Sequence, residues 1–223
     1  MNRLLIKKTT RRVAFVALAS ALSLMACAQS PTHVKPSAPL GSTQQTNPSP
    51  SAPAAKTGGF NKTIVLQGIS FQVTSANRGS LSTLRIVPKG LRGDNQPIEK
   101  EIDGTVTGAE IADLNADGSP EIYVYVTSAG SGSHGSLVAY SANNRKSLSD
   151  IYLPSLQDDP KATKGYMGHD EFRVVEGSLV RRFPVYGDKD TNAKPTGGTR
   201  QIQYKLKAGE AGWVLNPVRV DNF

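Results

Sequence analysis

Cysteine is almost absent from this chain, and Cys27 is its only one. An internal disulfide therefore cannot form, and neither a thiolate metal cluster nor a cysteine nucleophile is available after residue 27. Histidine is also scarce, with three residues in 223. A zinc site would depend mostly on carboxylates, which suit zinc poorly. The fold must therefore be held together by its apolar core alone.

Acidic residues are missing from the segment that precedes Phe60, and this gap distorts the net charge. The chain carries +8 formally, from 26 Lys and Arg against 18 Asp and Glu. Seven of the basic residues precede Phe60, so the remainder holds 19 basic and 18 acidic residues, a balance of +1. No basic stripe with interleaved aromatic residues follows, and we expect no nucleic-acid partner.

A short apolar run, from Val13 to Leu24, follows a basic start. This order is typical of a secretory signal peptide, which we place at residues 1–26. The tetrad Leu24-Met25-Ala26-Cys27 resembles the lipobox of bacterial lipoproteins, in which the cysteine receives a diacylglycerol. A leftover thiol after an ordinary signal peptide is the alternative. The lipobox predicts a periplasmic protein with a lipid anchor in the membrane, and Ala28 favours the outer membrane.

Residues 27–59 contain six prolines and no aromatic residue. Such a segment buries too little apolar surface to offset its chain entropy, so we predict a disordered linker. It would tether lipidated Cys27 to a folded domain at residues 60–223, which is long enough to bury a sizeable core. His33 lies in the linker and is not expected to be a ligand.

Long apolar helical patterns are missing after Phe60, where short runs rich in Val, Ile, Tyr and Phe alternate with turn residues. In Glu121–Val126, the Ile and Val side chains share one face and the two Tyr side chains share the other, which is the period of a strand. Glu176-Gly177 predicts a tight hairpin and Ala208–Gly212 a looser one. We therefore predict an all-β, mainly antiparallel barrel or sandwich of roughly eight to eleven strands. The clearest candidate strands are Thr63–Leu66, Phe71–Thr74, Leu84–Val87, Glu121–Val126, Leu137–Ser141, Phe172–Val175, Leu179–Tyr186, Gln201–Leu206 and Trp213–Val220.

Oxygen-bearing side chains alternate over residues 113–121, with Gly118 at the sixth position. This spacing resembles a calcium loop, since calcium prefers six to eight oxygen ligands and the glycine permits a sharp turn. Val124 stands where an EF-hand has its bidentate glutamate, so the segment looks more like the calcium loops between strands of β-propeller repeats. A metal-free turn with capped backbone amides is the alternative. The candidate ligands of calcium, the one cofactor suggested, are Asp113, Asn115, Asp117, Ser119 and Glu121.

Glycine is concentrated in the segment 128–136, which joins two apolar runs and carries His134 near its end. A nucleophile elbow needs Gly-x-Ser-x-Gly, but Ser131 stands two residues before Ser133. An envelope hydrolase using His134 or His169 is therefore an alternative without a complete catalytic constellation, and we expect no enzyme. The segment is better suited to a recognition loop on a rigid scaffold.

A second histidine, His169, is followed by Asp170 and Glu171. Neighbours in a strand point to opposite faces, so His169 and Asp170 need not meet. We expect a structural, hydrogen-bonded histidine rather than a metal ligand. The alternation Asp188, Asp190 and Asn192 lacks the glycine of a calcium loop and predicts a solvated loop.

Four runs taken together resemble the periplasmic inhibitors of invertebrate-type (i-type) lysozyme: ADLNADGSPEIYVYVTSAGSGSHGSLVAYS, GYMGHDEF, LVRRFPVY and GGTRQIQYKL. The resemblance covers most of residues 71–218. It implies an all-β envelope protein, often dimeric, that inserts a Ser-Gly-x-Tyr loop into the active-site cleft of the lysozyme.

In that family the serine and tyrosine of the loop contact the catalytic carboxylates. Here Ser131 and Gly132 match, Ser133 fills the variable place, and His134 replaces the tyrosine before Gly135. An imidazole can donate to a carboxylate, more strongly when protonated. A lysozyme inhibitor is thus the leading hypothesis, with a calcium-binding structural or adhesive envelope module and a hydrolase as alternatives.

Overall fold

The computed structural model describes residues 58–223. The predicted signal peptide, the Cys27 lipobox and the linker up to residue 57 lie outside the described residues. Neither helix of residues 58–223 has the length or apolar character needed to cross a membrane.

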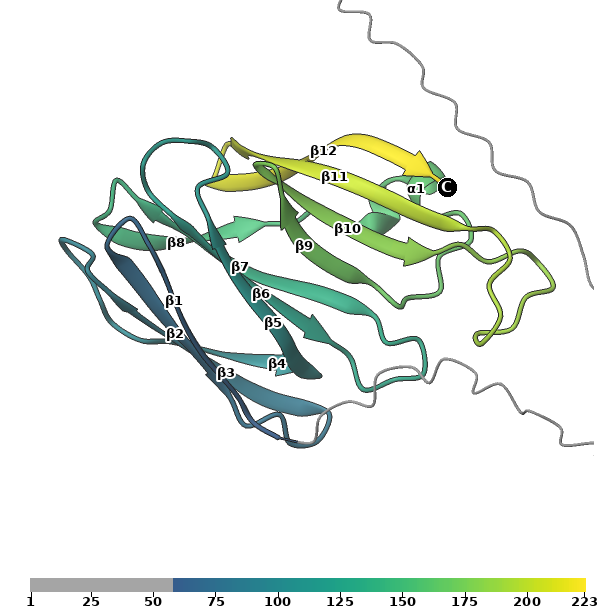
Figure 1. Ribbon diagram of the computed structural model, residues 1–223, viewed down its shortest axis with the longest axis horizontal. Coiled ribbons are helices and arrows are strands. Elements are labelled where there is room, and N and C mark those ends of the chain that lie inside the picture. The colour runs from purple at the N-terminus through teal and green to yellow at the C-terminus, as the bar shows by residue number, and fades with distance from the viewer. Residues whose placement is uncertain (1–57) are drawn as a thin grey trace, which may run out of the picture. The chain divides into compact units, whose positions relative to one another are not determined.

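Twelve strands form two sheets, which confirms the all-β class and exceeds the expected strand number by one (Figure 1). One sheet has the order β1-β2-β3-β4, and the other has the order β5-β6-β7-β8-β12-β11-β10-β9. All neighbours pair antiparallel except β8 and β12, which make a short parallel contact. The strands are β1 (Phe60–Leu66), β2 (Ile69–Ser75), β3 (Leu81–Lys89), β4 (Ile98–Asp103), β5 (Thr105–Ala112), β6 (Glu121–Thr127), β7 (Gly135–Asn143), β8 (Ser147–Tyr152), β9 (Glu171–Val175), β10 (Ser178–Pro184), β11 (Thr199–Ala208) and β12 (Trp213–Asn222).

Strand β6 separates two hydrophobic cores, because both of its faces are buried. Ile122, Val124 and Val126 pack into a core shared with the four-stranded sheet. Tyr123 and Tyr125 point the other way, into a core that they share with β10, β11 and β12. Figure 1 shows β5, β6 and β7 between strands β1–β4 and strands β9–β12. The alternation predicted for this strand is therefore real, and an apolar side chain is needed on each face.

The eight-stranded sheet curls until its two edge strands, β5 and β9, approach each other. Glu110 of β5 bridges them, because its carboxylate accepts a 2.6 Å hydrogen bond from the backbone N–H of Val174 in β9. The same carboxylate oxygen accepts a bond from the hydroxyl of Tyr125. A side chain thus completes a barrel that the backbone ladder leaves open.

Turns and helices complete the domain. The predicted hairpin at Glu176-Gly177 joins β9 and β10, and both residues have positive φ (46° and 67°). The helical content of residues 58–223 is limited to the 3-10 helix η1 (Leu156–Asp158) and α1 (Pro160–Thr163). Ser155 and Asp159 cap these helices through their side chains.

Candidate functional site

The glycine-rich segment forms the loop between β6 and β7, at the end of the strand that divides the two cores. Its base is closed by two hydrogen bonds, from the N–H of Ser128 to the carbonyl of His134 (2.9 Å) and from the N–H of His134 to Oγ of Ser128 (3.0 Å). Its tip turns at Gly130, whose carbonyl accepts from Ser133 (2.9 Å). Ser131 and His134 are exposed, so the two residues of the matched motif lie open to a partner.

The main chain of the loop is held by a second segment that is distant in sequence. The N–H of His169 donates to the carbonyl of Gly132 (2.7 Å), and the amide of Asn192 donates to the carbonyl of Ser131 (2.7 Å). The imidazole of His169 in turn contacts Oδ1 of Asn192 (3.0 Å). His169 therefore has a structural role, and Asn192 of the predicted solvated loop supports the candidate site.

Two glycines leave room for the imidazole of His134. A Cβ on Gly132 would lie 2.7 Å from its Nε2, and a Cβ on Gly168 would lie 3.1 Å from its Nδ1. Gly168 also has a φ of +97°, and a Cβ on it would collide with the carbonyl oxygen of Gly132. The ring leans on Tyr166 with a centroid distance of 5.5 Å in an edge arrangement. The position of His134 is therefore set by its surroundings rather than by the loop alone.

Asp170 connects the end of the loop to the residues that support it. Its carboxylate accepts from the N–H of Gly135 (2.7 Å), from the hydroxyl of Tyr166 (2.6 Å) and from Nε of Arg181 (2.7 Å). The Asp170 side chain is fully buried and that of Arg181 is 7% exposed. Since Gly135 follows His134 directly, this ion pair fixes the start of β7 and the end of the loop.

Arg181 is enclosed by aromatic rings. Its guanidinium lies 5.3 Å from the ring centroids of Tyr166 and Phe172 and 5.8 Å from that of Phe183. Burial alone would lower its pKa, but the charge of Asp170 raises the pKa overall. Burial also raises the pKa of Tyr166, and its hydrogen bond to Asp170 adds to the effect. Tyr166 is therefore a neutral phenol with a single hydroxyl proton.

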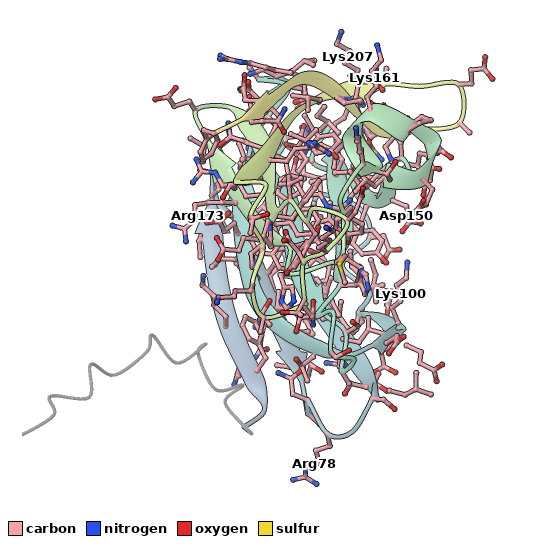
Figure 2. The ribbon with its side chains drawn as sticks, turned by 90° about the vertical axis from the view of Figure 1, so that its right-hand side faces the viewer. Arg78, Lys100, Asp150, Lys161, Arg173 and Lys207 are labelled. Atoms are coloured by element: carbon pink, nitrogen blue, oxygen red, sulfur yellow. The ribbon has the colours of Figure 1, made fainter. Side chains whose placement is uncertain are left out.

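A groove of about 730 Å³ lies next to this support, between β7, the end of β8 and the start of β12. Tyr166 and Arg181 contribute to its wall, and so does Gly135 at the end of the loop. Figure 2 shows the exposed side chains of Lys100 and Asp150, which also line the groove, projecting on the same side of the domain. The labelled cationic residues Arg78, Lys161, Arg173 and Lys207 project in other directions in the same view.

The acidic turn at the other end of β6 brings three carboxylates together. One oxygen each of Asp113, Asp117 and Glu121 lie within 4.8 Å of one another. Asp113 accepts from the N–H groups of Asp117 (3.0 Å) and Gly118 (2.9 Å), and Asn115 also accepts from Asp117. The observed bonds are those of a capped turn, and the oxygen set has the chemistry that calcium prefers.

Glu121 is the buried member of this group. Its carboxylate accepts from the N–H of Leu114 (2.8 Å) and contacts the hydroxyl of Ser141 (3.4 Å). Burial raises the pKa of Glu121 to about 8, and the charges of Asp113 and Asp117 add to this although the bond from Leu114 opposes it. Burial therefore favours the protonated form of Glu121 in the folded chain.

The structure thus gathers Ser131, Gly132, Ser133, His134 and Gly135 into one supported loop, and it places the acidic turn at the opposite end of β6. Within residues 58–223, the imidazole of His134 bonds Tyr166 and no serine hydroxyl, so a Ser–His nucleophile pair is not formed. The sequence reasoning missed Tyr166, Asp170 and Arg181 as supports. Arg181 was detectable, because it occupies an inward position between Leu179 and Phe183, where a charge needs a buried partner.

Comparison with known proteins gives one result for this chain. Residues 95–164 match the family model described as the periplasmic lysozyme inhibitor of I-type lysozyme. The match confirms the resemblance over that segment, which contains both the loop and the acidic turn. No curated protein and no solved structure matches the chain.

Proposed function

From the match of residues 95–164 to the periplasmic inhibitors of i-type lysozyme, we propose that this protein inhibits an i-type lysozyme by inserting the loop 128–135 into its active-site cleft. The partner is then a protein enzyme, and this chain itself is not an enzyme. The loop carries Ser131 and His134 at the positions where the family places its contacting serine and tyrosine.

The preorganised state of the loop is the observation that carries this proposal. Main-chain groups of Ser131, Gly132 and Gly135 are all bonded to the supporting segments, while the side chains of Ser131 and His134 stay exposed. A loop already fixed in one shape loses little conformational entropy on binding, which favours tight association. A glycosidase cleft holds one protonated and one ionised carboxyl group, so hydroxyl and imidazole groups provide matching partners.

The test is the inhibition constant of the chain and of Ser131→Ala and His134→Ala against an i-type lysozyme. Each substitution should weaken inhibition by about tenfold or more, because a buried polar contact at an interface is lost. His134→Tyr, which restores the family motif, should keep inhibition. Ser147→Ala, at an exposed serine of β8 outside the loop, should leave the constant unchanged. Equal constants for all these variants would show that another surface binds the enzyme.

We further propose that the protein is exported to the periplasm and held at the outer membrane by a lipid on Cys27. The family match supports the periplasm, and the sequence Leu24–Cys27 supports the anchor. A tether of this kind would keep the inhibitor near the peptidoglycan that it protects.

As a second candidate property, we propose that the turn from Asp113 to Glu121 binds calcium as a structural ion. This proposal is supported by three carboxylate oxygens, one each from Asp113, Asp117 and Glu121, which lie within 4.8 Å of one another. Asn115 and the Ser119 carbonyl would complete the ligand set, and the ion would fix the entry into β6. This property is compatible with lysozyme inhibition, because the turn and the loop lie at opposite ends of the strand.

A further inference from the structure

The imidazole of His134 has one hydrogen-bond partner within residues 58–223, the hydroxyl oxygen of Tyr166. This oxygen lies 3.2 Å from Nδ1. Nε2 has no partner in the same part of the chain, and the residue is exposed. Nε2 is therefore the ring nitrogen that remains free to meet a partner protein.

The direction of the Tyr166–His134 bond follows from counting protons. Tyr166 has a single hydroxyl hydrogen, which it donates to Oδ2 of Asp170 at 2.6 Å. Asp170 has no proton to return, because its carboxylate also accepts from Gly135 and from Arg181. Arg181 approaches the same hydroxyl oxygen with Nη2 (3.0 Å), and a guanidinium group is only a donor. Tyr166 therefore presents a lone pair to His134, so Nδ1 must carry the hydrogen.

We infer that Tyr166 is a positioning residue that selects the Nδ1–H tautomer of His134, so that the loop offers an unprotonated Nε2 to a protonated carboxyl group of its target. The inference rests on the proposed function for the identity of that target. A neutral imidazole in this tautomer accepts at Nε2, and a carboxylate facing it would oppose one lone pair with another. In a glycosidase cleft the protonated carboxyl is the general acid.

This tautomer divides the two contacts of the loop between the two carboxyl groups. Nε2 of His134 fits the general acid as an acceptor, and the hydroxyl of Ser131 fits the ionised carboxylate as a donor. If the general acid loses its proton, contact with Nε2 requires an imidazolium instead. A hydrogen bond between Nε2 and the general acid therefore needs a proton on one of the two groups. When both groups have lost their protons at alkaline pH, inhibition should weaken.

The charged and titratable groups around His134 are few. Tyr166 contacts it from the segment before β9, with Asp170 behind the hydroxyl, and Arg181 approaches the same oxygen from β10. Asp170 and Arg181 form an ion pair and largely cancel each other's charge at the imidazole. His169 touches the loop through its main chain and directs its ring to Asn192. The tautomer is therefore set by the hydrogen bond to Tyr166.

The decisive measurement is the tautomer of His134 by nitrogen NMR of the full chain labelled with ¹⁵N-histidine, at about pH 8, where histidine is generally neutral. The chain has three histidines, and substitution to Gln assigns each signal. His134 should be protonated at Nδ1. His169 is an internal control of opposite sense, because the Asn192 amide nitrogen is committed to Ser131 and leaves Oδ1 to accept from Nε2–H.

Tyr166→Phe keeps the ring and removes the hydroxyl acceptor. It should shift His134 toward the Nε2–H tautomer in the NMR measurement. It should also weaken inhibition by roughly three- to tenfold, as expected for one neutral hydrogen bond, when inhibition is measured at a pH at which the general acid of the lysozyme keeps its proton. An Nε2–H tautomer in the unsubstituted chain would overturn the inference, and so would an unchanged tautomer in a folded Tyr166→Phe variant. The NMR arm requires no enzyme, so it succeeds or fails independently of the proposed inhibition. If Tyr166→Phe does not fold, the unsubstituted chain still decides the outcome.

Discussion

At the scale of single residues, Asp170 connects the most features of the candidate site. It bonds the main chain where the loop ends, the phenol that touches His134, and a buried guanidinium. Removing one member of a buried ion pair leaves an uncompensated charge, whereas an exposed pair contributes little. The chain offers both kinds, because Arg85 and Glu99 form an exposed pair.

Asp170→Asn is expected to reduce the free energy of unfolding by about 3–5 kcal/mol, since it leaves Arg181 buried and unpaired. Glu99→Gln, the matched control in the exposed pair, should cost less than about 1 kcal/mol. Denaturant unfolding of the two variants measures both values. Similar losses for the two substitutions would contradict the central role given to Asp170.

One glycine of the loop and one glycine outside it provide a second pair of matched substitutions. Gly132→Ala should displace the imidazole of His134, because the new Cβ would lie 2.7 Å from Nε2 and 3.0 Å from the carbonyl of Met167. The control is Gly58→Ala, outside the loop, whose added Cβ meets no atom within 4 Å. We expect the first to weaken lysozyme inhibition by about tenfold or more, as for loss of the His134 contact itself. The second should leave the inhibition constant unchanged. Equal effects of the two substitutions would show that the space which Gly132 leaves for the imidazole of His134 does not determine binding.

At the scale of elements, the strands that the sequence revealed differ physically from those it concealed. The nine predicted stretches all fall within observed strands, although Leu179–Tyr186 runs two residues past β10. The missed strands are β4, β5 and β8. β4 is an edge strand with four charged residues in six, β5 contains a glycine and an irregular register, and β8 pairs over a short length. β4 and β8 each bury a single residue and β5 buries two, so too few inward apolar positions are present to show a period of two.

The support of the loop was less predictable than the strands. The motif Ser131–His134 was visible because it is contiguous, whereas Tyr166, Asp170 and Arg181 meet it only after folding. A hydrogen bond between residues 35 positions apart, such as that between Gly135 and Asp170, leaves no local periodicity. In this chain the sequence could locate the loop but could not show how it is held.

The turn before β6 should show the calcium dependence that was predicted from its spacing. Millimolar calcium should raise the melting temperature of the chain relative to excess chelator, because an ion that binds only the native state stabilises it. Asp117→Asn should reduce this rise, and Asp188→Asn, in an exposed loop, should keep it. A melting temperature that is the same with calcium and with chelator would establish the turn as a metal-free cap.

The same turn predicts a pH dependence in the presence of chelator. The pKa of Glu121 in the folded chain is about 8, against an ordinary value of 4.5. Between these values the folded chain keeps a proton that the unfolded chain releases, so stability is full below about pH 4.5 and falls as the pH rises toward 8. The loss should be on the order of a few kcal/mol. Glu121→Gln should remove this dependence in denaturant unfolding, and a persisting slope would assign it to another group.

At the scale of the whole molecule, the predicted anchor would determine where the domain acts. Cys27→Ser should move the protein from the membrane fraction to the soluble periplasmic fraction, because no thiol remains to carry a lipid. Ala26→Ser, a small residue before the same cysteine, should keep membrane partition. Fractionation followed by immunoblotting measures both. If Cys27→Ser stayed in the membrane fraction, the lipid anchor would be refuted. The homodimer suggested by the resemblance stays a prediction.

The way the loop is anchored has a consequence for how such a protein can diversify. Its anchors on the support are mostly main-chain groups, at Ser131, Gly132 and Gly135. Within residues 58–223 the side chains of Ser131 and Ser133 make no hydrogen bond, so these side chains do not hold the loop in place. Mutation at Ser131 can therefore change what the loop displays without altering its shape. If the loop binds as proposed, the domain is a framework for engineering inhibitors against other cleft-bearing hydrolases. Residue 131 is the position to randomise, whereas the positive φ of Ser133 (44°) restricts the choice at residue 133.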